Sequence, residues 1–180
     1  MPKLLKHFLT LFLPLLGIVL PAFSIADSAQ DSTVIAALAL NFARFTEWPA
    51  SILKPSDTSI QLCVLGDNVT QQAFSEIDHK PVGNRSLNIV SMSRIKNLGQ
   101  CHMLYISGID RSTSIQLLAE VSNQHILTLG EDDDFIRDGG MIHISIPDGK
   151  VNILVNLNAV KHAELQISSR VLKLVTIVNP

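Results

Sequence analysis

Residues 59–77, "SIQLCVLGDNVTQQAFSEI", join a run of β-forming residues to a segment with helix-capping residues. The apolar side chains of residues 59–65 favour a short buried strand, and Gly66 ends it. Asp67 or Asn68 can cap a short helix that follows directly. This strand–turn–helix unit is typical of βαβ packing and predicts an α/β fold.

The same alternation continues along the chain in both directions. Residues 31–49, "DSTVIAALALNFARFTEWP", repeat apolar residues at helical spacing and predict an amphipathic helix that starts at Asp31 or Ser32 and ends before Pro49. A capped helix is predicted in residues 112–122, "STSIQLLAEVS". Further short strands are expected in "RSLNIVSM" (85–92), "HMLYISG" (102–108) and "HILTLG" (125–130).

The C-terminal third has a different pattern. In residues 141–157, "MIHISIPDGKVNILVNL", Asp148-Gly149 separates two β-rich runs and predicts an antiparallel hairpin. Residues 163–178, "AELQISSRVLKLVTIV", are expected to form a final helix buried on much of its circumference. We therefore predict a single α/β domain with a mixed, mostly parallel sheet, a C-terminal antiparallel hairpin and helices on both faces.

The N-terminus has the three parts of a secretory signal peptide. Lys3 and Lys6 precede the apolar run of residues 8–23, and "SIA" places small residues just before Asp27. A retained membrane anchor is the alternative, but two prolines and a glycine interrupt the run. We expect residues 1–26 to be a signal peptide and residues 27–180 to form a domain in the periplasm that does not span the membrane after cleavage.

Composition and charge limit the classes of partner. The chain has 180 residues, of which 47% are hydrophobic and 17% are charged, which is enough for one good core. Its formal charge is -2 before removal of Lys3 and Lys6 and becomes more negative afterwards. An acidic domain does not attract nucleic acid.

Both cysteines, Cys63 and Cys101, remain after cleavage. An exported chain meets an oxidising compartment, so we expect these two thiols to form a disulfide. Two buried free thiols are the alternative.

The sequence predicts no catalytic, cofactor or metal site. It contains no Gly-x-Ser-x-Gly elbow, no lysine-containing phosphate loop and no His-x-x-x-His or Cys-x-x-Cys ligand pair. His102, His125 and His143 would converge on a metal only if their strands are neighbours.

Residues 130–144, "GEDDDFIRDGGMIHI", form an unusual connection between two predicted strands. Its acids are consecutive rather than alternating with spacers, which is not the pattern of a calcium loop. The apolar pair Phe135 and Ile136 lies inside this polar segment and is followed by Gly139-Gly140, which permits a sharp turn. From the residues alone, the apolar pair belongs either to the core or to an interface.

Several stretches together resemble blocks of the YfiR family of periplasmic proteins. They are "NFARFTEWP", "QLCVLGDN" with "CHMLYIS", "FIRDGGMIHI", and "NILVNLNAVKHAELQISSRVLKLV". The similarity runs in order from about Asp31 to Val178, and one conservative departure is Val171, where leucine is usual.

This resemblance implies a non-enzymatic repressor that binds the periplasmic sensor region of an inner-membrane diguanylate cyclase and so limits cyclic di-GMP signalling and biofilm formation. It also implies redox control through disulfides, with Cys63 and Cys101 at the matching positions. A second cysteine pair found in some members near the Gly-Gly element is absent here. A homodimer is compatible with the resemblance.

In this context we interpret the acidic loop as a partner-binding surface, with charges that orient the encounter and an exposed apolar pair that becomes desolvated. Its residues are Glu131, Asp132, Asp133, Asp134, Phe135, Ile136, Gly139 and Gly140. Arg44 and Trp48 form a second candidate patch, in which we expect Arg44 to be exposed and Trp48 to close the core. An alternative function is a periplasmic small-ligand module, with the ligand at the carboxyl ends of the strands near Gly66, Gly108 and Gly130.

Overall fold

The computed structural model describes residues 23–94 and 97–179. Most of the expected signal peptide, residues 1–22, therefore lies outside the described residues. Among the helices that are described, none is both long and apolar enough to cross a bilayer.

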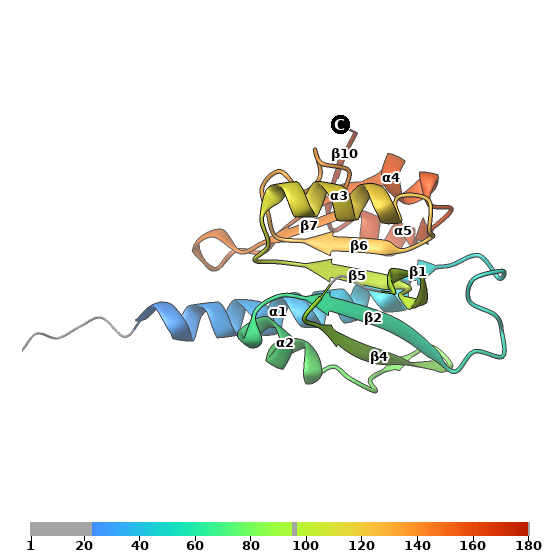
Figure 1. Cartoon of the computed structure of the whole chain (residues 1–180), viewed down its shortest axis with the longest axis horizontal. Helices are drawn as coiled ribbons and strands as arrows, with labels where there is room; N and C mark the ends of the chain where they lie inside the picture. Colours follow the sequence, from blue (N-terminus) through green and yellow to red (C-terminus); the bar gives the residue numbers. More distant parts are fainter. Residues whose placement is uncertain (1–22, 95–96, 180) are drawn as a thin grey trace, which may run out of the picture.

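The fold is built on a twisted mixed sheet (Figure 1). Over the described residues the strand order is β10-β8-β7-β6-β5-β2-β4-β3. The central strands β4, β2, β5, β6 and β7 are mutually parallel, β8 runs antiparallel to β7, and β3 runs antiparallel to β4. The strands are β2 (Ser59–Leu65), β3 (Pro81–Val82), β4 (Arg85–Met92), β5 (Met103–Ile106), β6 (Leu127–Gly130), β7 (Ile142–Ser145), β8 (Asn152–Asn156) and β10 (Thr176–Val178). The mostly parallel sheet and the C-terminal hairpin are confirmed.

Helices cover both faces of the sheet, as predicted. Along β2, Leu62 and Val64 enter a core that includes side chains of α1 (Phe23–Phe45) and α2 (Asn68–Ser75). Cys63 and Leu65 point to the opposite face and enter a second core with α3 (Arg111–Val121). The period-2 alternation of the strand therefore divides the interior into two layers, one on each face of the sheet.

Helices α2 and α3 each start at an aspartate that caps the first turn. The Asp67 carboxylate accepts from Thr70 N at 2.8 Å and caps α2, and Asp110 caps α3 through Thr113 N at 3.0 Å. The predicted start of the first helix at Asp31 or Ser32 is wrong, because α1 begins at Phe23. Residues 24–30 contain no glycine or proline, so nothing in them ends the helix.

The expected C-terminal helix is also wrong. Residues 163–178 instead contain β9 (Gln166–Ile167), the short α5 (Ser169–Leu172) and β10, and they follow α4 (Leu157–His162). Ser168 caps α5 through Arg170 N at 3.3 Å, and Leu174 is 83% exposed. The β-branched residues near the C-terminus pair with β8 at the sheet edge, so strand pairing prevails over helical spacing.

The predicted disulfide joins Cys63 in β2 to Cys101, which precedes β5. Their Cα atoms are 5.8 Å apart, and both residues are buried in the second core. The alternative of two free thiols is wrong. The bridge fastens the entry of β5 to the central strand beside it.

Replacing both cysteines by alanine should lower the free energy of unfolding by about 4 kcal/mol in the chain-entropy model, because the bridge closes a loop with a sequence separation of 38 residues. Denaturant titration of the variant and the parent protein measures this difference. Mass spectrometry of non-reduced protein should show the linked peptides, and two freely alkylated thiols in the native protein would contradict the bridge.

Candidate functional site

The acidic loop connects β6 to β7 at the carboxyl ends of the parallel strands. Phe135 is 1% exposed and Ile136 is 6% exposed, so both belong to the interior. The expectation that this pair is exposed for a partner is therefore wrong. The physical reason is that β6 and β7 are joined without a helix, so the loop itself must cover the second core, and Phe135 fills that position.

The glycines flanking Phe135 make room for its ring. A Cβ atom on Gly130 would overlap one edge of the ring, and a Cβ atom on Gly140 would overlap the other. Gly139 has φ +101°, a backbone conformation that favours glycine and allows the chain to turn back toward β7. Gly139 and Gly140 thus serve to pack and turn the loop.

Two arginines hold part of the acidic run. Arg111, in the first turn of α3, donates from Nε to Asp138 Oδ2 at 2.8 Å and from Nη2 to Asp138 Oδ1 at 2.7 Å. Its Nη1 lies 2.6 Å from Asp134 Oδ2, and Arg137 also pairs with Asp134. The hydrogen bond from Arg111 lowers the pKa of Asp138 below its usual value. These contacts neutralise Asp134 and fasten the loop to α3.

Glu131 is the acid closest to the interior. It accepts a hydrogen bond from the hydroxyl of Tyr105, whose fully buried ring packs on Phe74 with centroids 4.4 Å apart. Burial, with a smaller contribution from the carboxylates of Asp132, Asp31 and Asp67, raises the pKa of Glu131 to about 7. Sequence patterns did not single out the Tyr105–Glu131 pair.

The structure therefore separates the four consecutive acids by role. Asp132 and Asp133 are exposed, and within the described part of the chain neither carboxylate forms an ion pair. They line a small cavity of about 220 Å³ between the loop and the start of α3. Asp132 and Asp133 are thus the acids of the loop whose side chains are exposed and not held in an ion pair within the described residues.

The strand ends proposed for a small ligand are largely filled. A Cβ atom on Gly66 would lie 2.8 Å from Ser107 Oγ and 2.8 Å from Thr70 Cγ2, and Gly130 is covered by Phe135. Only Gly108, with φ +65°, has open space around it.

The second candidate patch lies where α1 ends and β1 (Thr46–Glu47) pairs with β9. Trp48 is half-buried against the first core, and its Nε1 donates to the His102 carbonyl at 3.1 Å. Arg44 is exposed, and its Nε donates to the Pro81 carbonyl at 3.1 Å. The exposure expected for Arg44 is confirmed, and Trp48 packs on the edge of the core as expected, whereas a role of either residue in partner binding stays a prediction.

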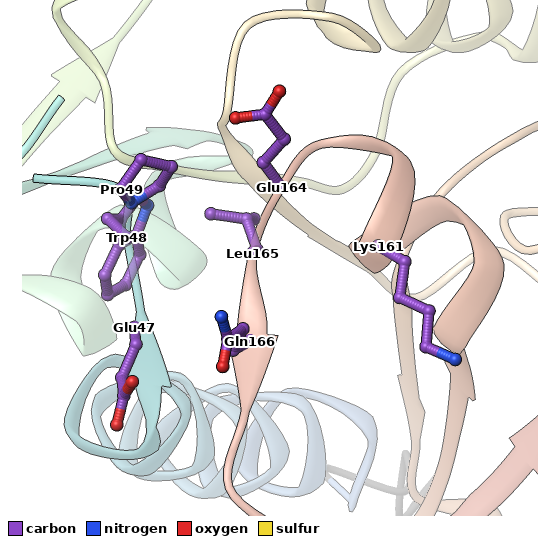
Figure 2. Close-up of a pocket in the computed structure, with 7 residues that line it drawn as sticks. All are labelled: Glu47, Trp48, Pro49, Lys161, Glu164, Leu165 and Gln166. Atoms are coloured by element: carbon purple, nitrogen blue, oxygen red, sulfur yellow. The ribbon is translucent and has the colours of Figure 1, made fainter. Parts of the chain in front are cut away.

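A cavity of about 470 Å³ adjoins Trp48 on the α4–β9 side (Figure 2). Figure 2 shows Leu165 extending toward Trp48 and Pro49, whereas the Lys161 side chain extends away from them. Glu47, Glu164 and Gln166 complete a lining of mixed charge. No sequence pattern predicted this cavity, because residues 47–49 and 161–166, which line it, are far apart in the chain.

The three strand-associated histidines have separate roles. His102 Nδ1 accepts from Gln61 N at 3.0 Å, and burial lowers the pKa of His102. His125 Nδ1 lies 2.8 Å from the Ala163 carbonyl, and His143 is buried in β7. Across residues 23–94 and 97–179, no group of three or more His, Cys, Asp or Glu residues is arranged to hold a metal ion.

Phe135→Ala should lower the free energy of unfolding by about 3–5 kcal/mol, because it removes a ring enclosed by the second core and two glycines. Ile115→Ala is the matched control, since Ile115 is 41% exposed and its truncation should change stability by no more than about 0.5 kcal/mol. Denaturant melts compare the two variants, and equal effects would show that Phe135 is not a core residue.

Glu131→Gln should raise the melting temperature at about pH 8 and change it little at about pH 5. The folded-state pKa of about 7 lies above the ordinary value of 4.5, so the folded protein holds an extra proton between these values. Its stability therefore falls as pH rises through that window, and the neutral amide removes the loss. Asp133→Asn, at an exposed position, is the control, and parallel pH profiles for Glu131→Gln and the parent would contradict the prediction.

Most of the chain is similar in sequence to one protein family. Residues 32–176 match the sequence profile of the YfiR/HmsC-like family. This span includes both cysteines, the acidic loop and all of the central parallel strands. The sequence has no significant match among curated proteins. Because the profile covers most of the chain, the protein belongs to the YfiR/HmsC-like family.

Proposed function

We propose that this chain is a periplasmic regulator that binds the periplasmic sensor region of an inner-membrane diguanylate cyclase and holds the enzyme inactive. The match of residues 32–176 to the YfiR/HmsC-like family is the observation that carries this proposal. Release of the regulator would then raise cyclic di-GMP and promote biofilm formation. In this role the chain acts by binding and performs no chemistry of its own.

Two features of the chain support an exported location. Residues 1–26 have the basic, apolar and small-residue parts of a signal peptide. The buried Cys63–Cys101 bridge is of a kind that persists in oxidising compartments and is rare in the cytosol.

The acidic loop remains the proposed partner-binding surface, but its exposed carboxylates, and not Phe135 and Ile136, would contact the partner. The buried side chains of Phe135 and Ile136 anchor the loop to the interior. Arg111 of α3 holds the loop through its hydrogen bonds to Asp138. The exposed carboxylates of Asp132 and Asp133 are thereby presented from a rigid base. A preorganised charged surface orients a partner at little entropic cost, and here it would favour a basic surface on the cyclase.

Replacing both Asp132 and Asp133 by lysine should slow association with the cyclase's periplasmic domain by on the order of tenfold at low salt, and by less at high salt. The matched control is Glu76→Lys with Glu120→Lys, which makes the same change in charge. Both residues are exposed and lie at the C-terminal ends of α2 and α3. Surface plasmon resonance at two salt concentrations measures both double variants beside the parent.

The possible results distinguish failure of the proposed regulatory function from failure of the proposed position of the interface. If the parent protein does not bind any membrane diguanylate cyclase from its own cell, the regulatory function is wrong. If the parent binds and both double variants bind equally well, the function stands and the acidic loop is not the interface.

A further inference from the structure

A second cavity, of about 320 Å³, adjoins Trp48 on the side of β1 that faces β3 and β4. Its walls come from the last turn of α1, from β1, from the segment after Trp48 and from the tight turn between β3 and β4. Its volume is at the lower end of the range for small-molecule sites. It is distinct from the cavity of Figure 2, with which it shares Glu47 and Trp48.

The cavity combines an apolar wall with two guanidinium groups. Leu53 and Val82 are buried core residues that contribute apolar surface. Arg44 reaches the cavity from α1, and Arg85 reaches it from the start of β4. These arginines are far apart in the sequence, and the pairing of β3 with β4 brings Arg85 to the same end of the sheet as Arg44.

Both guanidinium groups donate hydrogen bonds to neutral acceptors. Arg44 donates from Nε to the Pro81 carbonyl, and Arg85 donates from Nη2 to the Lys54 carbonyl at 2.8 Å and from Nη1 to Asn84 Oδ1 at 3.3 Å. All of these acceptors are uncharged. In the described ranges, neither arginine forms an ion pair with a carboxylate.

Two residues that line this cavity each have a buried polar atom without a hydrogen-bond partner among the described residues. The two atoms are Nε of Arg85 and Oγ1 of Thr46, a residue that is only 7% exposed. Buried polar atoms almost always have a partner, so each of these two residues of the cavity lining keeps unused hydrogen-bonding capacity. Both atoms belong to residues that line the same cavity.

We propose that this cavity binds a small carboxylate with a short apolar body. The planar fork of a guanidinium matches a carboxylate, and the apolar wall matches a hydrocarbon chain. Glu47 also lines the cavity, and its negative charge disfavours a doubly charged phosphate more than a singly charged carboxylate. The site lies away from the acidic loop, so the proposal does not rest on the proposed partner interaction.

Isothermal titration of the purified protein with hexanoate tests the site, with hexanol, hexylamine and hexyl phosphate as probes of equal chain length. We expect saturable binding of hexanoate and at least tenfold weaker binding of the other three. Equal binding of hexanol would show a merely apolar cavity, preference for hexylamine would assign the site to Glu47, and preference for hexyl phosphate would show a phosphate site. Each of these results would overturn the proposal, as would the absence of hexanoate binding.

Single variants locate the contact. Arg44→Gln and Arg85→Gln should each weaken hexanoate binding at least tenfold, whereas Arg94→Gln, at an exposed position beyond the opposite end of β4, should leave it unchanged. Melting temperatures check the fold, and because Arg44 is exposed its variant remains informative even if Arg85→Gln unfolds. Unchanged affinity in Arg44→Gln, or equal losses in all three variants, would overturn the assignment.

Discussion

The burial of β2 on both faces is the constraint on which the rest of the structure depends. This strand lies between β4 and β5, and its alternating side chains reach both cores. A strand without a solvent-facing side requires a layer of helices on each face, and α1 with α2 supplies one layer while α3 supplies the other. The Cys63–Cys101 bridge adds a covalent link from this strand to the segment entering β5. Both cysteines are buried, so a reductant would reach the bridge only after local opening of the second core.

The same requirement explains the acidic loop. The connection between two parallel strands usually contains a helix that covers the sheet. The connection between β6 and β7 is short and consists of turns without a helix. Phe135 takes the place of a helical side chain, and Gly130 and Gly140 lack the Cβ atoms that would collide with its ring. The polar residues around it are consequently sorted by position: Glu131 toward Tyr105, Asp134 toward two arginines, and Asp132 with Asp133 toward solvent. One apolar side chain thus determines which charges are exposed.

Local signals predicted much of this fold, and features that depend on distant segments were missed. The strand β2, the Asp67 cap and the Asp148-Gly149 hairpin rest on short-range chemistry, and all three are confirmed. Residues Thr176–Val178 form a strand and not a helix because they pair with the edge of β8, and no local pattern reveals that pairing. Likewise, Phe135 could be assigned to the core only with the position of α3 known, and the cavity of Arg44 and Arg85 exists only because β3 turns back onto β4. Helical or strand periodicity carries no information about such contacts between segments.

The two polar regions of the molecule lie at opposite ends of the parallel strands, and α1 reaches both. Asp31 contributes to the electrostatics of Glu131, whereas Arg44, about 20 Å farther along the helix, lines the cavity. Between them Ile35, Ala39 and Phe42 are buried against the sheet, so this helix can respond only as a packed body and not by local flexing. A ligand in the cavity would change the affinity for a partner at the acidic loop only if it favoured one of two positions of that helix. By linkage the partner would then change the affinity for the ligand by the same factor, whereas two sites on an immobile α1 would bind independently.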